Sequence, residues 1–148
     1  MPSSPSFPSY NTFCRPAGLA ADPLGDLRRD MMVWAEPVIA DCIGEAYGDY
    51  ELGAAFRSLI STHHRRLWRA LILENRPLIE QVRDELTRDL LRVGIQADVV
   101  EDIDNSIMEE LMDIVFKRFR SSREAAKGFS LVLLSAASNI GASRPLAA

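Results

Sequence analysis

The chain has 148 residues, 47% of them hydrophobic, so it can bury the core of one ordinary domain without disulfides or a structural metal. Its formal net charge of −4 argues against a nucleic-acid partner, because neutralising phosphates requires a surplus of Lys and Arg. Cys14 and Cys42 are the only cysteines and give no disulfide framework, which favours a reducing, cytoplasmic compartment.

The two ends of the chain differ in composition from the middle. Residues 1–21 are rich in Pro and Ser and lack the basic start and apolar run of a signal peptide, so we expect a disordered leader. Residues 22–142 are expected to form a single helical domain, followed by a flexible tail at 143–148. The longest uncharged stretch, 128–143, is too short and too polar to span a membrane, so we expect no membrane partner.

The first helical pattern begins after Asp22-Pro23. Apolar residues recur there at three- and four-residue steps: Leu27, Met31, Trp34, Val38 and Cys42. Proline removes a backbone donor and clashes with the preceding turn, so Pro37 predicts two helices, at about 23–35 and 37–47.

Two well-bounded helices are predicted next. One is expected to begin after Asp49, whose side chain can cap it, and to end near Glu74. Its apolar stripe consists of Phe56, Ile60, Leu67 and Leu71. Arg76-Pro77 begins the following helix, and Gly94 supplies the left-handed residue that commonly ends one.

The last two predicted helices are Ala97–Phe119 and Ser122–Gly141. Acidic residues come first in the former and basic residues last, an order that suits the helix dipole. The sequence Ser121-Ser122-Arg123-Glu124 is typical of a helix start. No segment shows strand alternation, so we predict an all-α fold of about six helices.

His63 and His64 are the only histidines, and they flank the apolar stripe of their helix. The ordinary interpretation is a partly buried histidine with a local hydrogen bond, although either could hold haem or act as a base. His64 is followed by Arg65 and Arg66, which keeps a phosphotransfer histidine as an alternative. Zinc normally needs three or four ligands, which the chain does not supply in any familiar spacing, so we expect no metal.

Other chemical motifs are weak or absent. Asp102, Asp104 and Ser106 imitate the start of a calcium loop, but the glycine that such a loop requires is missing. We interpret these acids as a solvated helix face, with a basic partner as the alternative. The sequence contains no nucleophile elbow, phosphate loop or dinucleotide fingerprint, so we expect neither an enzyme nor a cofactor.

Short segments at matching intervals carry a resemblance to a known family. They are Met32-Val33-Trp34-Ala35-Glu36-Pro37 with Ala46-Tyr47, then Leu67-Trp68-Arg69-Ala70-Leu71, then Leu91-Arg92-Val93-Gly94-Ile95. In this order they resemble the bacterial sensor globins, that is, protoglobins and globin-coupled sensors, over residues 26–141. The resemblance implies a globin-like bundle that serves as a sensory domain.

The chain departs from this family at the haem ligand. The family places a haem-binding histidine four residues before the glycine that corresponds to Gly94, and Leu90 stands there in this chain. No histidine follows His64, so the resemblance implies a haem-less globin. Haem bound from His63 or His64 on the preceding helix is the alternative.

Sensor globins commonly dimerise through their last two helices, and the apolar pattern independently supports a surface there. The stripe of the penultimate helix is wider than one core face, and the last helix is apolar or small on several faces. We predict a homodimer interface made by Met108, Leu111, Met112, Val115, Leu131 and Leu134. A last helix enclosed entirely by its own domain is the alternative.

The predicted function is therefore a haem-less, globin-like regulatory domain in signal transduction. We expect it to bind another signalling protein or a small apolar ligand and to transmit a shift at its dimer interface. The alternatives are an unrelated helical protein that antagonises a signalling enzyme, and a histidine phosphotransfer domain that uses His64.

Overall fold

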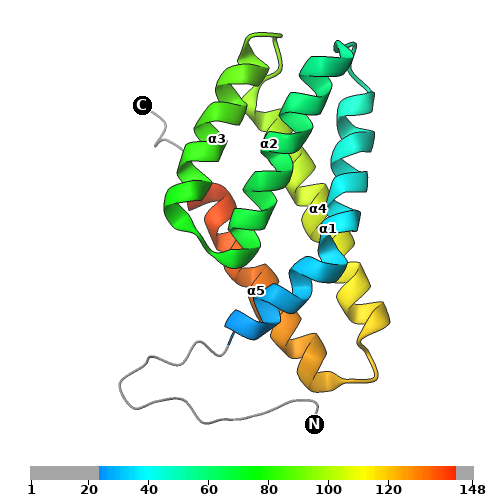
Figure 1. Ribbon diagram of the computed structural model, residues 1–148. Coiled ribbons are helices and arrows are strands. Elements are labelled where there is room, and N and C mark those ends of the chain that lie inside the picture. Colours follow the sequence, from blue (N-terminus) through cyan, green and yellow to red (C-terminus); the bar gives the residue numbers. More distant parts are fainter. Residues whose placement is uncertain (1–23, 143–148) are drawn as a thin grey trace.

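A computed structural model describes residues 24–142, which form five α-helices (Figure 1). They are α1 (Gly25–Gly48), α2 (Ala54–Leu73), α3 (Arg76–Leu91), α4 (Ala97–Arg118) and α5 (Arg123–Ala142). No strand occurs within residues 24–142, so the all-α class is confirmed, with five helices instead of about six. The predicted leader, 1–21, and the tail, 143–148, lie outside the described residues.

The prediction of two helices around Pro37 was wrong, because α1 continues through this residue. Proline has no N–H, so the carbonyl of Val33, four residues earlier, loses its helical hydrogen-bond donor. Pro37 and Val33 both lie on the exposed face of α1, where water can donate to that carbonyl. The helix changes direction instead of ending: in Figure 1 its first part, in blue, runs at an angle to the rest, in cyan. The core face stays continuous, with Met31, Ala35, Ile39, Ile43 and Tyr47 buried at four-residue steps.

The helices form two layers around one core (Figure 1). In one layer α2 packs between α1 and α3. In the other, α4 and α5 form an antiparallel pair in which α4 also contacts α1 and α3, and α5 also contacts α1 and α2. Among the largest fully buried side chains are Trp68, Leu71, Leu90, Ile107 and Leu111. None of the helices within residues 24–142 has the length and apolar character needed to cross a membrane.

Helix ends follow the sequence signals with one exception. Gly94 has a φ of 83°, as predicted for a residue that ends a helix, and the Ser122 hydroxyl accepts a hydrogen bond from the Ala125 amide at 3.3 Å. Asp49 does not cap α2, which begins at Ala54 after Gly53. Asp49 instead ends α1, where its amide donates to the carbonyl of Tyr47.

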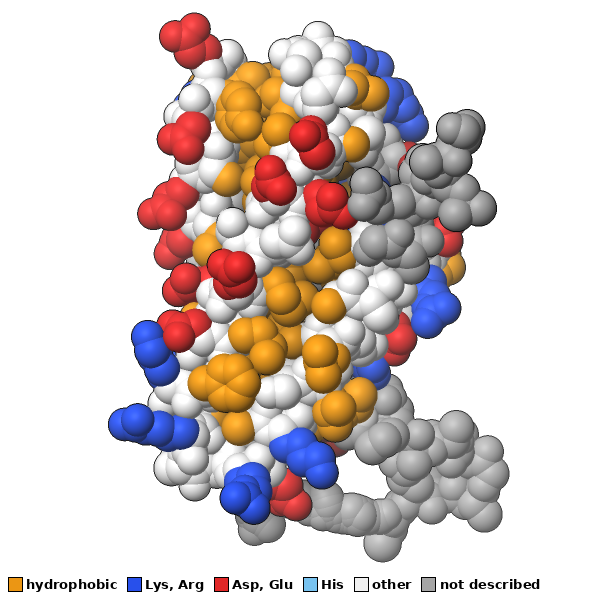
Figure 2. Space-filling model, turned by 180° about the vertical axis from the view of Figure 1, so that it is seen from behind, with side chains coloured by type: hydrophobic (Ala, Val, Ile, Leu, Met, Phe, Trp, Pro, Cys, Tyr) orange, Lys and Arg blue, Asp and Glu red, His pale blue; other side chains and the backbone are white. Residues whose placement is uncertain are grey.

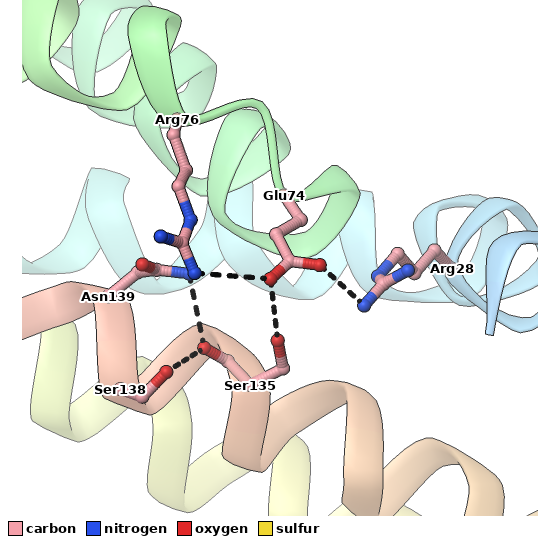
Figure 3. Close-up of polar contacts among 6 residues, drawn as sticks. All are labelled: Arg28, Glu74, Arg76, Ser135, Ser138 and Asn139. Carbon is pink, nitrogen blue, oxygen red and sulfur yellow. Dashed lines mark hydrogen bonds and ion pairs between the residues drawn. The ribbon is translucent and has the colours of Figure 1, made fainter. Parts of the chain in front are cut away.

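Glu74 ties three parts of the fold together (Figure 3). Its carboxylate lies 2.8 Å from the guanidinium of Arg28 on α1 and accepts from Ser135 of α5 at 3.4 Å. Nη2 of Arg76, at the start of α3, lies 3.8 Å from Oε2 of Glu74. Glu74 adopts a left-handed conformation with φ 58°, which places its side chain among these partners at the turn between α2 and α3.

Candidate functional site

Four side chains from three helices form a buried hydrogen-bonded network, named here the Asp104 network. It consists of Tyr47 on α1, His64 and Trp68 on α2, and Asp104 on α4, each at most 1% exposed. The Tyr47 hydroxyl lies 2.8 Å from His64 Nδ1, and His64 Nε2 lies 2.6 Å from Asp104 Oδ1. The same carboxylate oxygen accepts from Trp68 Nε1 at 2.9 Å. Asp104 is therefore the point at which the network converges.

The proton positions in the Asp104 network follow from what each group can donate. A carboxylate oxygen accepts, so the tautomer of His64 that pairs with Asp104 has its hydrogen on Nε2 and donates it. In that tautomer Nδ1 accepts from the Tyr47 hydroxyl. Every polar atom that makes these contacts is paired, as buried polar groups require.

Regular helix spacing brings these side chains together. His64 and Trp68 lie one turn apart on α2, while Tyr47 lies one turn beyond Ile43 on the core face of α1. The Cα atoms of α2 and α4 do not approach within 8 Å of one another. The long side chains of the Asp104 network therefore fill the space between these two helices.

In order of contact, Tyr47, His64 and Asp104 resemble a nucleophile, a base and an orienting carboxylate. Tyr47 and His64 are 0% exposed and line neither pocket of the described residues, so a substrate cannot reach the nucleophile or the base in this conformation. Burial also raises the pKa of Tyr47 well above its ordinary value, and the charge of Asp104 raises it further. The hydroxyl therefore stays protonated, and the hydrogen bonds of the Asp104 network join α1, α2 and α4.

A pocket of about 580 Å³ lies on the other side of Asp104, between α3 and α4. Val100, Asp104 and the α5 residue Ile140 are its buried residues, with Arg83 half-buried beside them. The other lining residues are exposed or partly exposed: Asp84, Thr87, Arg88, Leu91, Ala97, Asp98 and Glu101. We call this space the α3–α4 pocket. Asp104 thus connects an accessible pocket with the buried network.

Arg83 is the unusual cation of the α3–α4 pocket. Its Nη1 donates to the carbonyl of Asn139 at 3.2 Å, while its buried Nη2 has no hydrogen-bond partner in the part of the chain that the structure describes. Within that part no carboxylate lies within 4.0 Å of its guanidinium. Burial lowers the pKa of Arg83, and the nearby charges of Asp104, Asp84 and Glu101 oppose this shift.

The residues that imitate a calcium loop lie in two different places. The structure also has a second, smaller pocket of about 250 Å³. Asp102 and Ser106 line it together with Cys42, whereas Asp104 belongs to the Asp104 network. Burial raises the pKa of the Cys42 thiol, and Glu110 raises it further. The described residues include no group of three or more His, Cys, Asp or Glu side chains that could hold a metal ion.

The two histidines have separate environments. His64 belongs to the Asp104 network, while Nε2 of His63 lies 3.7 Å from a carboxylate oxygen of Asp89 on α3. Leu90, at the position of the family's haem ligand, is 1% exposed and packs in the core. Neither histidine lines the two pockets described above. The structure therefore does not bring His63 and His64 together around a common space.

The residues predicted for a dimer interface fall into three groups. Leu111 and Val115 are fully buried in the core, so they cannot contribute to a surface and that part of the prediction is corrected. Met108 and Met112 are partly buried, and Leu131 and Leu134 are 44% and 60% exposed. Sequence reasoning missed Phe116, which is 59% exposed and follows Met108 and Met112 at four-residue steps on α4.

Asp104 was also misinterpreted as part of a solvated acidic face, because the acids of α4 were considered as one group. Its side chain is buried, whereas Asp102 is exposed. The signal was present in the spacing, since Val100, Asp104, Ile107 and Leu111 follow one another at four- and three-residue steps. An acid at such a position predicts a buried carboxylate with partners on another helix.

Comparison with known proteins gave no family assignment: no protein-family model, no curated protein and no solved structure matches the chain.

Proposed function

We propose that this chain is a non-enzymatic regulatory module that forms a homodimer through α4 and α5 and acts on another signalling protein. The observation that carries the proposal is an apolar surface on these two helices, named here the α4–α5 face. It consists of exposed Phe116, Leu131 and Leu134 with partly buried Met108 and Met112. Figure 2 shows hydrophobic side chains gathered on this side of the molecule, toward the turn between α4 and α5.

A second copy of the chain fits this surface for reasons of symmetry and charge. Two antiparallel helix pairs that meet about a two-fold axis form a four-helix bundle, in which one face covers itself. The acids of α4 extend from Asp98 to Asp113, and Lys117 and Arg118 lie in its last turn. An antiparallel meeting of two α4 helices places the basic end of each against acidic residues of the other.

The non-enzymatic part of the proposal is supported by the burial of the Asp104 network. Its His64 is 0% exposed and both ring nitrogens are engaged, so a phosphoryl donor cannot reach it in this conformation. This disfavours the phosphotransfer alternative. The globin-like fold and the haem-less state remain proposals that rest on the sequence resemblance and on Leu90.

Light scattering on the purified chain tests the homodimer. We expect a dimer at tens of micromolar, and we expect Phe116→Glu or Leu134→Lys to shift it to monomer, because each change buries a charge without a partner. Val33→Glu is the matched control, since Val33 is an exposed apolar residue, 80% exposed, on a different helix, α1. Circular dichroism confirms that every variant stays helical.

A wild-type monomer would remove the homodimer and leave the α4–α5 face to a different protein. A dimer that survives in both helical variants would place the interface elsewhere. Haem uptake is measured in the same preparations. A Soret band that disappears in His63→Ala or His64→Ala would contradict the haem-less proposal.

A further inference from the structure

The α3–α4 pocket has the size and lining of a small-molecule site. Its volume of about 580 Å³ falls within the range of roughly 300–1,000 Å³ that is usual for such sites. Leu91, Val100 and Ile140 supply apolar surface from three helices. Arg83 and Asp104 supply polar groups to the buried and half-buried part of the lining, as ligand sites commonly have.

Arg83 indicates that the ligand needs a hydrogen-bond acceptor. Its half-buried guanidinium donates one hydrogen bond, to the Asn139 carbonyl, and its Nη2 has no acceptor among residues 24–142. A buried donor without an acceptor is costly, so a ligand that supplies one gains affinity. A carbonyl oxygen beside Arg83 meets this need.

Asp104 indicates that the ligand needs a hydrogen-bond donor. The charges that line the pocket disfavour an anionic ligand. Oδ1 of Asp104 already accepts from His64 and Trp68, and a carboxylate oxygen has further capacity as an acceptor. Even without Glu101, three carboxylates, those of Asp84, Asp98 and Asp104, line the pocket beside the two guanidiniums of Arg83 and Arg88. This surplus of acids repels a ligand carboxylate or phosphate.

We propose that the α3–α4 pocket binds a neutral, amphipathic carboxamide. Its carbonyl accepts from Arg83, its N–H donates to Asp104, and its apolar chain packs against Leu91, Val100 and Ile140. The proposal rests on the regulatory function proposed above, for which it names the ligand class. The dimer is measured separately, so either proposal can fail without the other.

Trp68 provides an internal reporter of this site. Its Nε1 donates to the carboxylate of Asp104, so a ligand that binds Asp104 changes the polarity around the indole. The chain has two tryptophans, and Trp34→Phe leaves Trp68 as the only one. Trp34 Nε1 has no hydrogen-bond partner in the described residues, and its ring packs against Phe119 and Phe129, so phenylalanine is a mild replacement.

The experiment titrates the Trp34→Phe protein with three probes of equal chain length: octanamide, octanoate and octylammonium. We expect octanamide to shift the Trp68 emission saturably, and octanoate and octylammonium to bind at least ten-fold more weakly. Octanoate binding as tightly as octanamide would overturn the neutral ligand class. No saturable response to any of the three probes, by fluorescence and by calorimetry, would overturn the site.

Variants in the same background locate the binding. Arg83→Met is expected to weaken octanamide at least ten-fold, and Arg88→Met, which removes an exposed guanidinium from the same pocket and helix, by less than three-fold. Thr87→Phe keeps Arg83 and fills part of the pocket, so it should also abolish the response. Equal effects of Arg83→Met and Arg88→Met, or full binding by a folded Thr87→Phe protein, would contradict the proposed pose. Light scattering on these samples shows whether the dimer persists independently.

Discussion

Replacing Asp104 with alanine tests whether the Asp104 network stabilises the fold. The change removes the acceptor of two buried donors, His64 Nε2–H at 2.6 Å and Trp68 Nε1–H at 2.9 Å. An unsatisfied buried donor costs about 1–3 kcal/mol, so the two together predict a loss of about 2–6 kcal/mol. That loss is a large part of the roughly 5–15 kcal/mol that stabilises a typical domain.

Asparagine at this position separates hydrogen bonding from charge. The amide oxygen of Asp104→Asn can still accept from both donors, and the buried negative charge is removed. We therefore expect a loss of less than half that of Asp104→Ala. Asp102→Ala is the matched control, because Asp102 lies half a turn away on the exposed side of α4 and should change stability by less than about 0.5 kcal/mol.

The assay is urea unfolding followed by circular dichroism, at one protein concentration because a dimer makes apparent stability depend on concentration. The midpoint and the slope are both fitted, so that a change in the native state is separated from a change in stability. A loss below about 1 kcal/mol for Asp104→Ala, or a loss equal to that of Asp102→Ala, would refute the structural role of the network.

Two further predictions use the same unfolding assay. Burial raises the pKa of Tyr47 above the value near 10 of an unfolded tyrosine. The protonated Tyr47 therefore makes its full contribution to the free energy of unfolding below about pH 10, and this contribution falls at higher pH, where the unfolded state releases the proton. Above about pH 10 the wild type should lose about 1.4 kcal/mol per pH unit more than Tyr47→Phe, and parallel curves would contradict this. Glu74→Gly should destabilise less than Glu74→Ala by about 1 kcal/mol, because both lose the carboxylate and only glycine relieves the left-handed φ of 58°. Equal losses would show that the backbone there is not strained.

Helix positions could be predicted from the sequence where local chemistry determines them. The start of α3 at Arg76-Pro77 and the left-handed Gly94 follow from the fixed φ of proline and the freedom of glycine. Pro37 misled the prediction, because a local rule does not show that α1 places this residue on its solvent side. Tertiary packing on the opposite face keeps the two halves of α1 in one helix.

The Asp104 network could be predicted only in part, because it joins residues 17 to 40 positions apart in sequence. The spacing of Asp104 with Ile107 and Leu111 indicates a buried acid, and His64 lies one turn before Trp68. Which helices face each other depends on the whole arrangement, and no local pattern pairs α4 with α2. The α3–α4 pocket depends in addition on Ile140 of α5, so it could not be read from α3 and α4 alone.

Helix α4 contributes residues to both the proposed ligand pocket and the proposed dimer surface. Its first half lines the α3–α4 pocket through Val100, Glu101 and Asp104, and the α4–α5 face begins one turn after Asp104, at Met108. An α-helix is stiff over this distance, so a ligand that pulls Asp104 toward the pocket moves both regions together. The same pull acts on His64 and Trp68, which anchor α4 to α2. If the proposed ligand binds in this way, the core opposes its pull on Asp104 and α4 transmits that pull to the α4–α5 face, so the proposed pocket and the proposed dimer surface would be coupled.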